Sequence, residues 1–402
     1  MNETRAIIEA FDESQARGDA SALATLVSVE GSAYRRPGAR MLVTKSGAST
    51  GTISAGCLES DVIEHAQHVI KTNQTKLIEY DTTSTNEEIV WGLGLGCNGV
   101  VRVLVEPLAP QSSYLAALRR TLAEQLNIAP LVVATVFHHS SSGSTPTTAR
   151  VGIGARLCLN ENGEIQSADA LSGELATMIE RDARAALREE TSGVRVYEQH
   201  GATTKVFIET ITPPVPLVVF GAGHDALPII ELARGLGWQT EVVDVQERSI
   251  SRARFAGADK VTLARAETIN EQVGVTARTL ALVMTHNYAH DQLLLRFLLS
   301  SPARYVGVMG PRKRTERMLN ELAESDRSSR LQESHMSRLY APVGLDIGAN
   351  TPTEIALSII AEMRAVVAAR EGGHLCRRRA PIHDGQDAAA GGAGARPAQT
   401  NA

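Results

Sequence analysis

The sequence has few cysteines, few aromatic residues and no long hydrophobic run. Its cysteines, at positions 57, 97, 158 and 376, are far apart and form no Cys-x-x-Cys pair. No stretch approaches the roughly 18 apolar residues that span a bilayer. The start, MNETRAIIEAFDESQARG, carries acidic residues and is typical of an amphipathic helix rather than an export signal. Together these absences favour a reduced, cytoplasmic setting.

The chain also lacks a strong excess of charge. Lysine and arginine total 40 against 45 acidic residues, a formal net charge of −5, which gives no reason to expect nucleic acid or an anionic membrane as a partner. With 43% hydrophobic and 21% charged residues, the composition is that of a globular protein. Because 402 residues exceed one ordinary core, we expect at least two domains.

The first half alternates strand and helix patterns. Short runs rich in β-branched residues predict strands, and apolar residues at helical spacing predict helices at 58–72 and near 173–189. We therefore expect an α/β domain over residues 1–212, followed by a linker in the proline-rich segment 211–216. No internal repeat of solenoid type is visible. The predicted strands are 22–31, 39–47, 75–81, 99–107, 130–139, 155–160, 194–199 and 205–211.

The second half has a more regular rhythm. Apolar strands such as LVVF, TEVVDV, LALVMT and YVGVMG alternate with helices, which predicts a Rossmann-like, doubly wound parallel sheet over residues 213–372. The remainder, 373–402, ends in an Ala/Gly-rich segment without periodicity, which we expect to be disordered.

A glycine turn follows the first of these strands. Gly221, Gly223 and Ala226 match G-x-G-x-x-G/A, and Asp244 ends the next strand. The glycines would permit a tight turn and let backbone N–H groups approach a pyrophosphate at a helix N-terminus, while Asp244 could accept hydrogen bonds from ribose hydroxyls. His224 inside the turn is unusual for a plain NAD site. The alternative is a turn that needs glycine only for its backbone angles.

Two further loops would lie at the same edge of the sheet. His286 ends a strand, and Asp291 opens the following helix; in the alternative interpretation, these residues only pack and cap. Arg312, Lys313 and Arg314 begin a helix, where cations oppose the helix dipole unless an anion binds there. A solvated charged face is the alternative. No hydride-transfer pair stands out, so the site is interpreted as holding something phosphorylated.

The first half adds cations and thiols in glycine-rich segments. Arg35 and Arg36 precede closely spaced glycines, and Cys57 and Cys97 each follow a glycine. An approachable thiolate suits soft metals or persulfide chemistry. A small buried hydrophobic residue is the alternative for each cysteine.

Taken together, these segments resemble the XdhC/CoxI family. The matching segments are EGSAYRRPGARMLVTKSGASTGTISAGCLESDV, WGLGLGCNGVVRVLVEPL, LVVFGAGHDALP, MTHNYAHD, YVGVMGPRKRTERML and APVGLDIGANTPTEIALSI, in the family's order over roughly residues 15–370. The resemblance implies an N-terminal XdhC/CoxI domain and a C-terminal Rossmann domain. It also implies an accessory protein that binds the molybdenum cofactor while a cysteine desulfurase exchanges a molybdenum oxygen for sulfur. The protein would then deliver the cofactor to an apo molybdenum hydroxylase of the xanthine dehydrogenase, aldehyde oxidoreductase or CO dehydrogenase type.

This resemblance allows the candidate residues to be assigned to the two ends of the cofactor. The phosphate end would suit the turn from Gly221 to Ala226 together with Arg312 and Arg314, and the dithiolene and molybdenum end would suit Cys57 or Cys97 near Arg35 or Arg36. We expect a non-catalytic chaperone that forms a homodimer. The alternatives are an NAD(P)-dependent oxidoreductase and a purely structural interaction protein.

Overall fold

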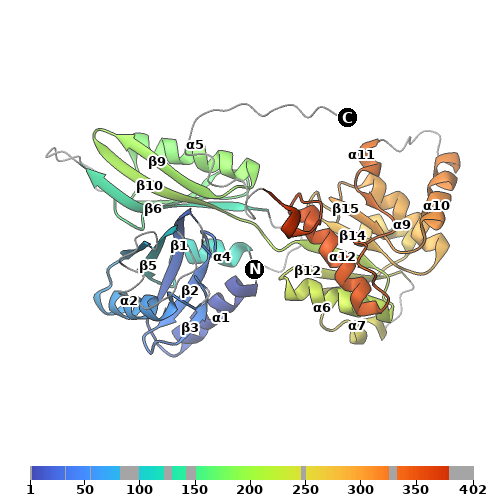
Figure 1. Ribbon diagram of the computed structural model, residues 1–402, viewed down its shortest axis with the longest axis horizontal. Helices are drawn as coiled ribbons and strands as arrows, with labels where there is room; N and C mark the ends of the chain where they lie inside the picture. Colours follow the sequence, from blue (N-terminus) through green and yellow to red (C-terminus); the bar gives the residue numbers. More distant parts are fainter. Residues whose placement is uncertain are drawn as a thin grey trace. The chain divides into compact units, whose positions relative to one another are not determined.

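The computed structural model describes residues 2–31, 33–54, 56–81, 99–121, 129–141, 151–245, 250–325 and 333–379. The chain forms two compact units (Figure 1). We call residues 3–121 and 129–213 the N-terminal unit and residues 214–378 the C-terminal unit. Within the described ranges, no helix has both the length and the apolar character needed to cross a bilayer. Of the tail 373–402, expected to be disordered, residues 373–379 are described and include a 3₁₀ turn at Leu375–Arg377, and residues 380–402 lie outside the described residues.

The C-terminal unit is built on a six-stranded parallel sheet in the order β13-β12-β11-β14-β15-β16. Its central strands are buried on both faces, which is why they appear in the sequence as continuous apolar runs. The predicted Rossmann-like sheet is confirmed. The strands are β11 (Pro216–Phe220), β12 (Gln239–Asp244), β13 (Lys260–Leu263), β14 (Leu280–Val283), β15 (Tyr305–Val308) and β16 (Leu339–Tyr340).

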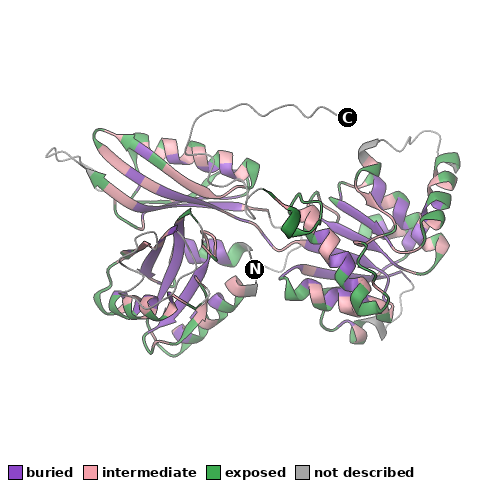
Figure 2. Ribbon diagram, viewed as in Figure 1, coloured by how far each residue is buried: buried purple, intermediate pink, exposed green. Residues whose placement is uncertain are grey.

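Helices cover both faces of this sheet, with one apolar core on each side. The helices α6 and α12 pack on one face, and α9 packs on the other, so the purple strands of Figure 2 lie between half-exposed helices. The described helices are α6 (Leu227–Gly235), α7 (Ile250–Arg254), α8 (Ile269–Gln272), α9 (Tyr288–Ser300), α10 (Arg312–Ser325), α11 (Glu333–Met336) and α12 (Pro352–Val367), with 3₁₀ turns at His224–Ala226, Ala266–Thr268 and Leu375–Arg377.

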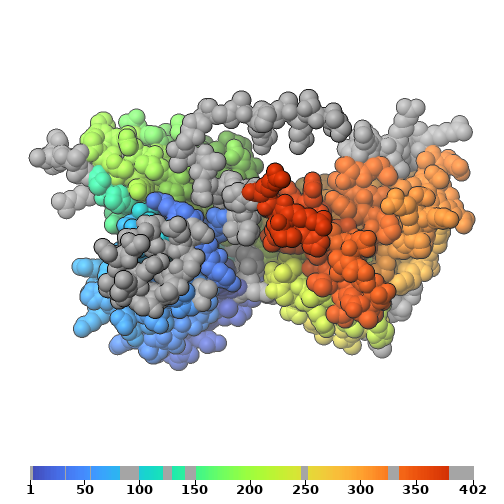
Figure 3. Space-filling model, viewed as in Figure 1, coloured from blue at the N-terminus to red at the C-terminus, as the bar shows by residue number. Residues whose placement is uncertain are grey.

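The start of α12 shows how local sequence fixes a boundary. Thr351 accepts a hydrogen bond from the Glu354 N–H, and Glu354 in turn accepts one from the Thr351 N–H, with Pro352 in the first turn. This capping box satisfies backbone donors that a helix start otherwise leaves unpaired. After α12, residues 368–377 are exposed, and Figure 3 shows this dark red segment on the surface of the unit.

The N-terminal unit contains two five-stranded antiparallel sheets, in the orders β3-β2-β1-β5-β4 and β8-β7-β6-β10-β9. We call them the first sheet and the second sheet. Both are mixed with helices, as predicted. The elements are α1 (Asn2–Ala16), β1 (Ser21–Gly31), β2 (Arg40–Thr44), β3 (Ser49–Gly51), α2 (Glu59–Thr72), β4 (Lys76–Asp81), β5 (Gly99–Pro107), α4 (Ser113–Thr121), β6 (Leu131–Ser141), β7 (Arg156–Leu159), β8 (Ile165–Asp169), α5 (Gly173–Glu189), β9 (Gly193–Gln199) and β10 (Ala202–Ile211).

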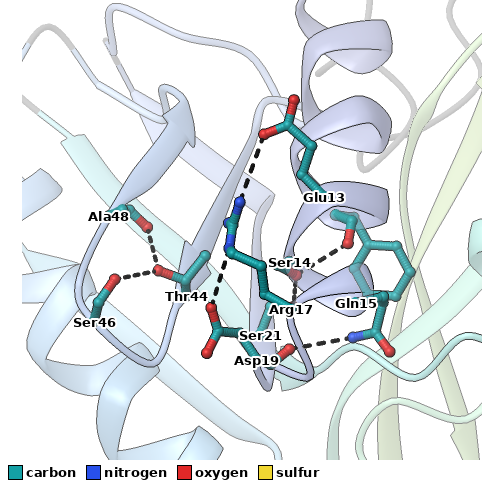
Figure 4. A network of polar contacts seen from close by, with 10 residues as sticks. Glu13, Ser14, Gln15, Arg17, Asp19, Ser21, Thr44, Ser46 and Ala48 are labelled. Carbon is teal, nitrogen blue, oxygen red and sulfur yellow. Dashed lines mark hydrogen bonds and ion pairs between the residues drawn. The ribbon is translucent and has the colours of Figure 1, made fainter.

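Apolar cores on both faces of each sheet organise this unit. The helix α2 packs on the outer face of the first sheet, and α5 packs on the outer face of the second sheet. The inner faces of the two sheets share further apolar clusters with α1 and α4. The turn from α1 into β1 is fixed by polar contacts (Figure 4): Ser14 donates to the Phe11 carbonyl at 3.0 Å and lies 3.1 Å from the Ser21 hydroxyl.

Candidate functional site

The carboxyl edge of the parallel sheet forms the first candidate region. The strand β11 pairs with both β12 and β14, so the direction of winding reverses between β11 and β14. Ligands of doubly wound sheets bind beside this reversal, between the loops that follow the two strands. Here these loops are residues 221–223 after β11 and 284–287 after β14. The strand β15 pairs with β14, so the loop that follows β15 lies beside them.

Gly221 has a backbone role in this edge. Its φ of +132° is one that residues with a side chain rarely adopt, and a Cβ at this position would overlap the carbonyl oxygen of Met284. The loops after β11 and β14 therefore meet backbone to backbone. Ala226 is fully buried and lets the first turn of the following helix approach the sheet, which is the packing role expected of this position.

A carboxylate lies over the glycine turn. A Cβ on Gly223 would overlap the Oδ1 atom of Asp225, and the Oδ2 atom of the same residue lies 2.8 Å from Nε2 of His286. His286 has a left-handed φ of +58° and a side chain that is 62% exposed. A phosphate approaching Gly223 would meet this carboxylate, so the carboxylate must move before an anion can bind here.

The other residues of the turn differ in their exposure. His224 is exposed at the mouth of the turn, whereas Asp244 is buried at the end of β12 and is only 1% exposed. Both lie at the carboxyl edge, on neighbouring strands. The structure thus brings the predicted turn residues together.

The three predicted cations of α10 separate into two groups. Arg314 lies 2.7 Å from the buried carboxylate of Asp291, which also accepts hydrogen bonds from the Thr285 hydroxyl and N–H at 2.5 and 3.2 Å. Arg314 is therefore satisfied from within the fold. Arg312 and Lys313, by contrast, are exposed and make no ion pair with any side chain in the described part of the chain.

The second candidate region is one end of the first sheet. In the antiparallel register Gly31 faces Gly99, and Met41 faces Gly51. One end of the first sheet is consequently formed by the end of β1, the start of β2, the end of β3 and the start of β5. The loops at this end of the sheet are residues 33–39, which include Arg35 and Arg36, and residues 52–58, which include Cys57. Cys97 lies outside the described residues.

Arg35 ties these two loops to the first helix. Its guanidinium forms an ion pair with Glu3 and donates to the Thr52 hydroxyl at 3.2 Å, while the Thr52 N–H donates to Glu3 at 2.8 Å. Part of the charge of this arginine is thus already neutralised by a carboxylate. Cys57 is half-buried and follows Gly56, whose φ of +105° favours glycine.

Glu59 holds the Cys57 loop in place. Its carboxylate accepts hydrogen bonds from the Ser54 hydroxyl and N–H, the latter at 2.8 Å, and from the N–H groups of Ile53 and Leu58 at 3.3 and 3.2 Å. Burial alone would raise the pKa of Glu59, but the hydrogen bonds from Ser54 and the neighbouring backbone outweigh it and lower the pKa.

Both units of the chain match a known family. Residues 14–81 match the model of the XdhC and CoxI family, and residues 217–363 match that of the XdhC Rossmann domain. A Bacillus subtilis protein, named as a probable subunit of xanthine dehydrogenase, is 32% identical over 90% of this chain and 97% of its own length. The chain belongs to the XdhC and CoxI family.

Two further proteins are similar to this chain along nearly its whole length. The Escherichia coli protein named "Molybdenum cofactor insertion chaperone PaoD" is 22% identical over 90% of this chain and 88% of its own. A crystal structure described as a xanthine dehydrogenase from Bacillus halodurans superposes with a TM-score of 0.69 at 26% identity, covering 93% of this chain and 98% of the other. The fold of this XdhC/CoxI chain therefore matches an experimental structure throughout both units.

Sequence reasoning missed the carboxylates that face the predicted cations of this family member. Asp225 stands inside the quoted glycine turn, and Glu3 stands in the first helix, but neither was assigned a role. Asp225 places a negative charge in a turn that was predicted to bind a phosphate. That conflict could have shown from the sequence that the turn differs from an ordinary phosphate site. Glu3 gave no signal, because its pairing with Arg35 depends on tertiary structure. In the described ranges no group of three His, Cys, Asp or Glu side chains is arranged to hold a metal ion.

Proposed function

We propose that this chain is a maturation factor that binds the molybdenum cofactor, holds it during sulfuration and delivers it to an apo molybdenum hydroxylase. The observation that carries the proposal is the family membership, together with a full-length relative named as a molybdenum cofactor insertion chaperone and another named for xanthine dehydrogenase. The cofactor is the cargo of this protein, and the chain's own residues bind and release it without changing its covalent bonds.

The phosphate end of the cargo is assigned to the carboxyl edge of the C-terminal unit. Arg312 and Lys313 supply exposed positive charge at the start of α10, and an arginine grips a phosphate with two hydrogen bonds. Gly221, Gly223 and His224 line the neighbouring turn. Phosphate binding there requires Asp225 and its partner His286 to move, because the carboxylate otherwise repels the phosphate.

Asp225 opposes the pyrophosphate of an NAD(P)-dependent oxidoreductase in this turn as it opposes the phosphate of the cargo, so the turn does not separate the two functions. A dinucleotide pyrophosphate normally sits directly on the backbone N–H groups of such a turn, and here Asp225 lies over Gly223. Asp244 could accept hydrogen bonds from ribose hydroxyls in either case, so it does not separate the two functions.

The dithiolene and molybdenum end is assigned to the end of the first sheet. A half-buried thiol at Cys57 is accessible yet shielded, and thiolates are suitable ligands for soft metal centres. Cys97 belongs to the same assignment. Arg35 and Arg36 lie on the adjoining loop, where positive charge attracts an anionic ligand. The proposed partners are the apo-enzyme and a cysteine desulfurase, and the proposed assembly is a homodimer.

The test is retention of molybdopterin. The full chain is mixed with molybdopterin, passed through a desalting column and assayed for bound pterin by fluorescence after oxidation. We expect Cys57→Ala and Arg312→Glu to lower the retained fraction, the latter with a weaker dependence on salt because one phosphate contact is lost. The matched controls are Cys376→Ala, an exposed thiol, and Arg364→Glu, an exposed arginine near the end of α12.

Two outcomes would overturn the proposal. If the unmodified protein retains no pterin at any concentration, it does not carry this cargo. If it oxidises NADH with turnover, the oxidoreductase is the correct function. Retention that falls equally in the variants and their controls would leave the function standing but remove Cys57 and Arg312 as binding residues.

A further inference from the structure

The N-terminal unit contains the same arrangement twice. The strands of the first sheet, β1 to β5, occupy the same order in space as those of the second sheet, β6 to β10. In each sheet one helix follows the third strand and packs on the outer face. We call residues 21–107 copy 1 and residues 131–211 copy 2.

The correspondence extends to individual positions. Thr25 faces Arg40 across β1 and β2, and Thr135 faces Arg156 across β6 and β7. Each arginine follows a glycine and an alanine, and the N–H of each glycine donates at 2.8 Å to a carbonyl of the first strand. The first strand of each copy also has its register shift at the matching place, at Val27 and Phe137, as the ladder with the fifth strand shows.

The helices and the fourth strands correspond as well. The buried positions Val62, Ala66 and Val69 of α2 have the same spacing as Ile179, Ala183 and Ala186 of α5. In both copies a tyrosine of the fourth strand donates a hydrogen bond to an aspartate of the helix. These pairs are Tyr80 with Asp61 at 2.5 Å and Tyr197 with Asp182 at 3.0 Å.

The two copies exchange ion pairs where their inner faces meet. Arg40 of copy 1 pairs with Glu209 of copy 2, and Arg156 of copy 2 pairs with Glu106 of copy 1. The two glutamates occupy equivalent positions, opposite Leu23 and Val133 of the first strands. All four side chains are nearly buried, so each crossed pair is shielded from solvent.

Tyr114 of α4 lies between the crossed pairs and breaks their equivalence. Its ring is 4.5 Å from the Arg156 guanidinium and 5.4 Å from that of Arg40, and its hydroxyl accepts a hydrogen bond from Arg40 at 2.6 Å. Val27, Leu104, Phe137 and Phe207 form one apolar cluster beside this network, with matching positions drawn from both copies.

We propose that the N-terminal unit is a duplicated module whose copies pack as a dimer within one chain, and that Glu209 of copy 2 positions the ligand loop of copy 1. The second part rests on the proposed function, which assigns Arg35 and Arg36 to the cargo. Glu209 is a positioning residue: it holds Arg40 and lies against Gly38, where an added Cβ would come within 3.0 Å of its Oε1 atom. Gly38 ends the loop that carries both arginines.

The copies differ at the loops, and the proposed function assigns cargo-binding residues to copy 1 alone. Between the third strand and the helix, copy 1 has residues 52–58, including Cys57, whereas copy 2 has only residues 170–172. Copy 2 also lacks a cysteine in that loop. Its own glycine, Gly154, is less tightly covered, with Glu106 Oε2 at 3.8 Å from an added Cβ. Copy 2 thus serves as the structural partner of copy 1.

The second crossed pair supplies a control for the first, although Glu209 also accepts a hydrogen bond from the Tyr114 hydroxyl, at 3.3 Å. Glu209→Gln and Glu106→Gln remove the same charge from equally buried pairs, but only the first adjoins the loop at 33–38. We expect similar falls in melting temperature, because either change leaves a buried arginine without its counter-charge. In Glu209→Gln, amide hydrogen exchange of residues 33–38 should speed up about tenfold, since the charged hydrogen bond that holds Arg40, two residues after Gly38, is lost.

Glu106→Gln should instead leave exchange at residues 33–38 unchanged and speed it at residues 151–154. Molybdopterin retention should fall about threefold to tenfold in Glu209→Gln alone, by the loss of loop restraint. If both variants loosen residues 33–38 equally, or neither does, the positioning role is refuted. If exchange responds but retention does not, the loop is positioned as proposed and the assignment of Arg35 and Arg36 to the cargo fails.

Two further variants keep the test open if the single changes unfold the protein. Arg40→Gln with Glu209→Gln, and Arg156→Gln with Glu106→Gln, remove both charges of one crossed pair, which leaves no buried ion unpaired. In a double-mutant cycle of melting temperatures, Arg40→Gln should couple to Glu209→Gln and not to Glu106→Gln. Coupling to Glu106 instead would show that the pairs form within each copy and would refute the crossed arrangement.

Discussion

Replacing Glu59 by glutamine should loosen the loop that carries Cys57. The carboxylate of Glu59 accepts four hydrogen bonds from residues 53–58, and it stands in the first turn of α2, where a negative charge is favourable. Glutamine keeps one acceptor oxygen, which could still serve the N–H groups of Ser54 and Ile53. Its amide nitrogen cannot accept from the Leu58 N–H or from the Ser54 hydroxyl.

The size of the effect follows from these contacts. A hydrogen bond to a charged group contributes about 1.5–3 kcal/mol, and the half-exposed position of Glu59 places its two lost bonds at the lower end of that range. We expect Glu59→Gln to lower the free energy of unfolding by about 2–3 kcal/mol at neutral pH. For a unit of this size, that loss corresponds to a fall in melting temperature of about 4–10 °C.

The pH dependence provides an independent check. The pKa of Glu59 is lowered in the folded protein, so the unfolded chain takes up the proton more readily. The stabilisation by Glu59 is therefore present above the unfolded pKa, about 4.3, and is lost as the pH falls through the lower folded value. The difference in unfolding free energy between wild type and Glu59→Gln should shrink toward pH 3.

The assay combines thermal unfolding with alkylation of Cys57, followed by mass spectrometry of the peptide that contains it. Alkylation should become faster in Glu59→Gln as the loop opens. Glu64→Gln, an exposed change on the same helix, is the control and should alter neither quantity. The reasoning is wrong if Glu64→Gln is equally destabilising, if the difference between wild type and Glu59→Gln is the same at every pH, or if Cys57 reacts at an unchanged rate.

Two changes in the C-terminal unit test its backbone directly. Gly221→Ala should lower the free energy of unfolding by more than about 3 kcal/mol, because φ is +132° and the added Cβ would overlap the Met284 carbonyl oxygen. The control is Gly235→Ala at the end of α6, where an added Cβ meets open space. In the same thermal unfolding this change should be neutral or slightly stabilising. Thr351→Ala should cost about 1 kcal/mol by removing the hydrogen bond to the Glu354 N–H, and an unchanged melting temperature would show that this cap contributes nothing.

The parallel sheet was predictable because its signals are local. Its central strands are short apolar runs closed by glycine or polar residues, and α9 and α12 follow with capped starts, at Asn287 and at Thr351 with Glu354. Burial on both faces leaves little ambiguity about strand character. The turn at Gly221 was predicted for the same reason, since the requirement for a positive φ is imposed within a few residues.

The duplication in the N-terminal unit was not predictable in the same way. What repeats in the letters is short: an Ala-Thr pair, a Gly-Ala-Arg triplet and one glutamate per copy. The surrounding core positions need only be apolar and fill the core together. Val27 and Phe137, for example, occupy matching positions with different side chains, so the two copies can share a fold without sharing these residues. The crossed pairs become visible only when the register of both sheets is known.

The partners of the predicted cations were likewise not predictable from the sequence, and these partners also affect how the proposed cargo is released. At each candidate region the structure pairs an arginine with a carboxylate from elsewhere in the chain, Arg314 with Asp291 and Arg35 with Glu3. A paired arginine gains less from a phosphate, because it must first lose or share its own partner. Under the proposed function, phosphate binding at the carboxyl edge then depends mainly on Arg312 and its neighbour Lys313. A carrier that must give up its ligand is served by such partial neutralisation, since full exposure of every cation would strengthen binding and slow dissociation.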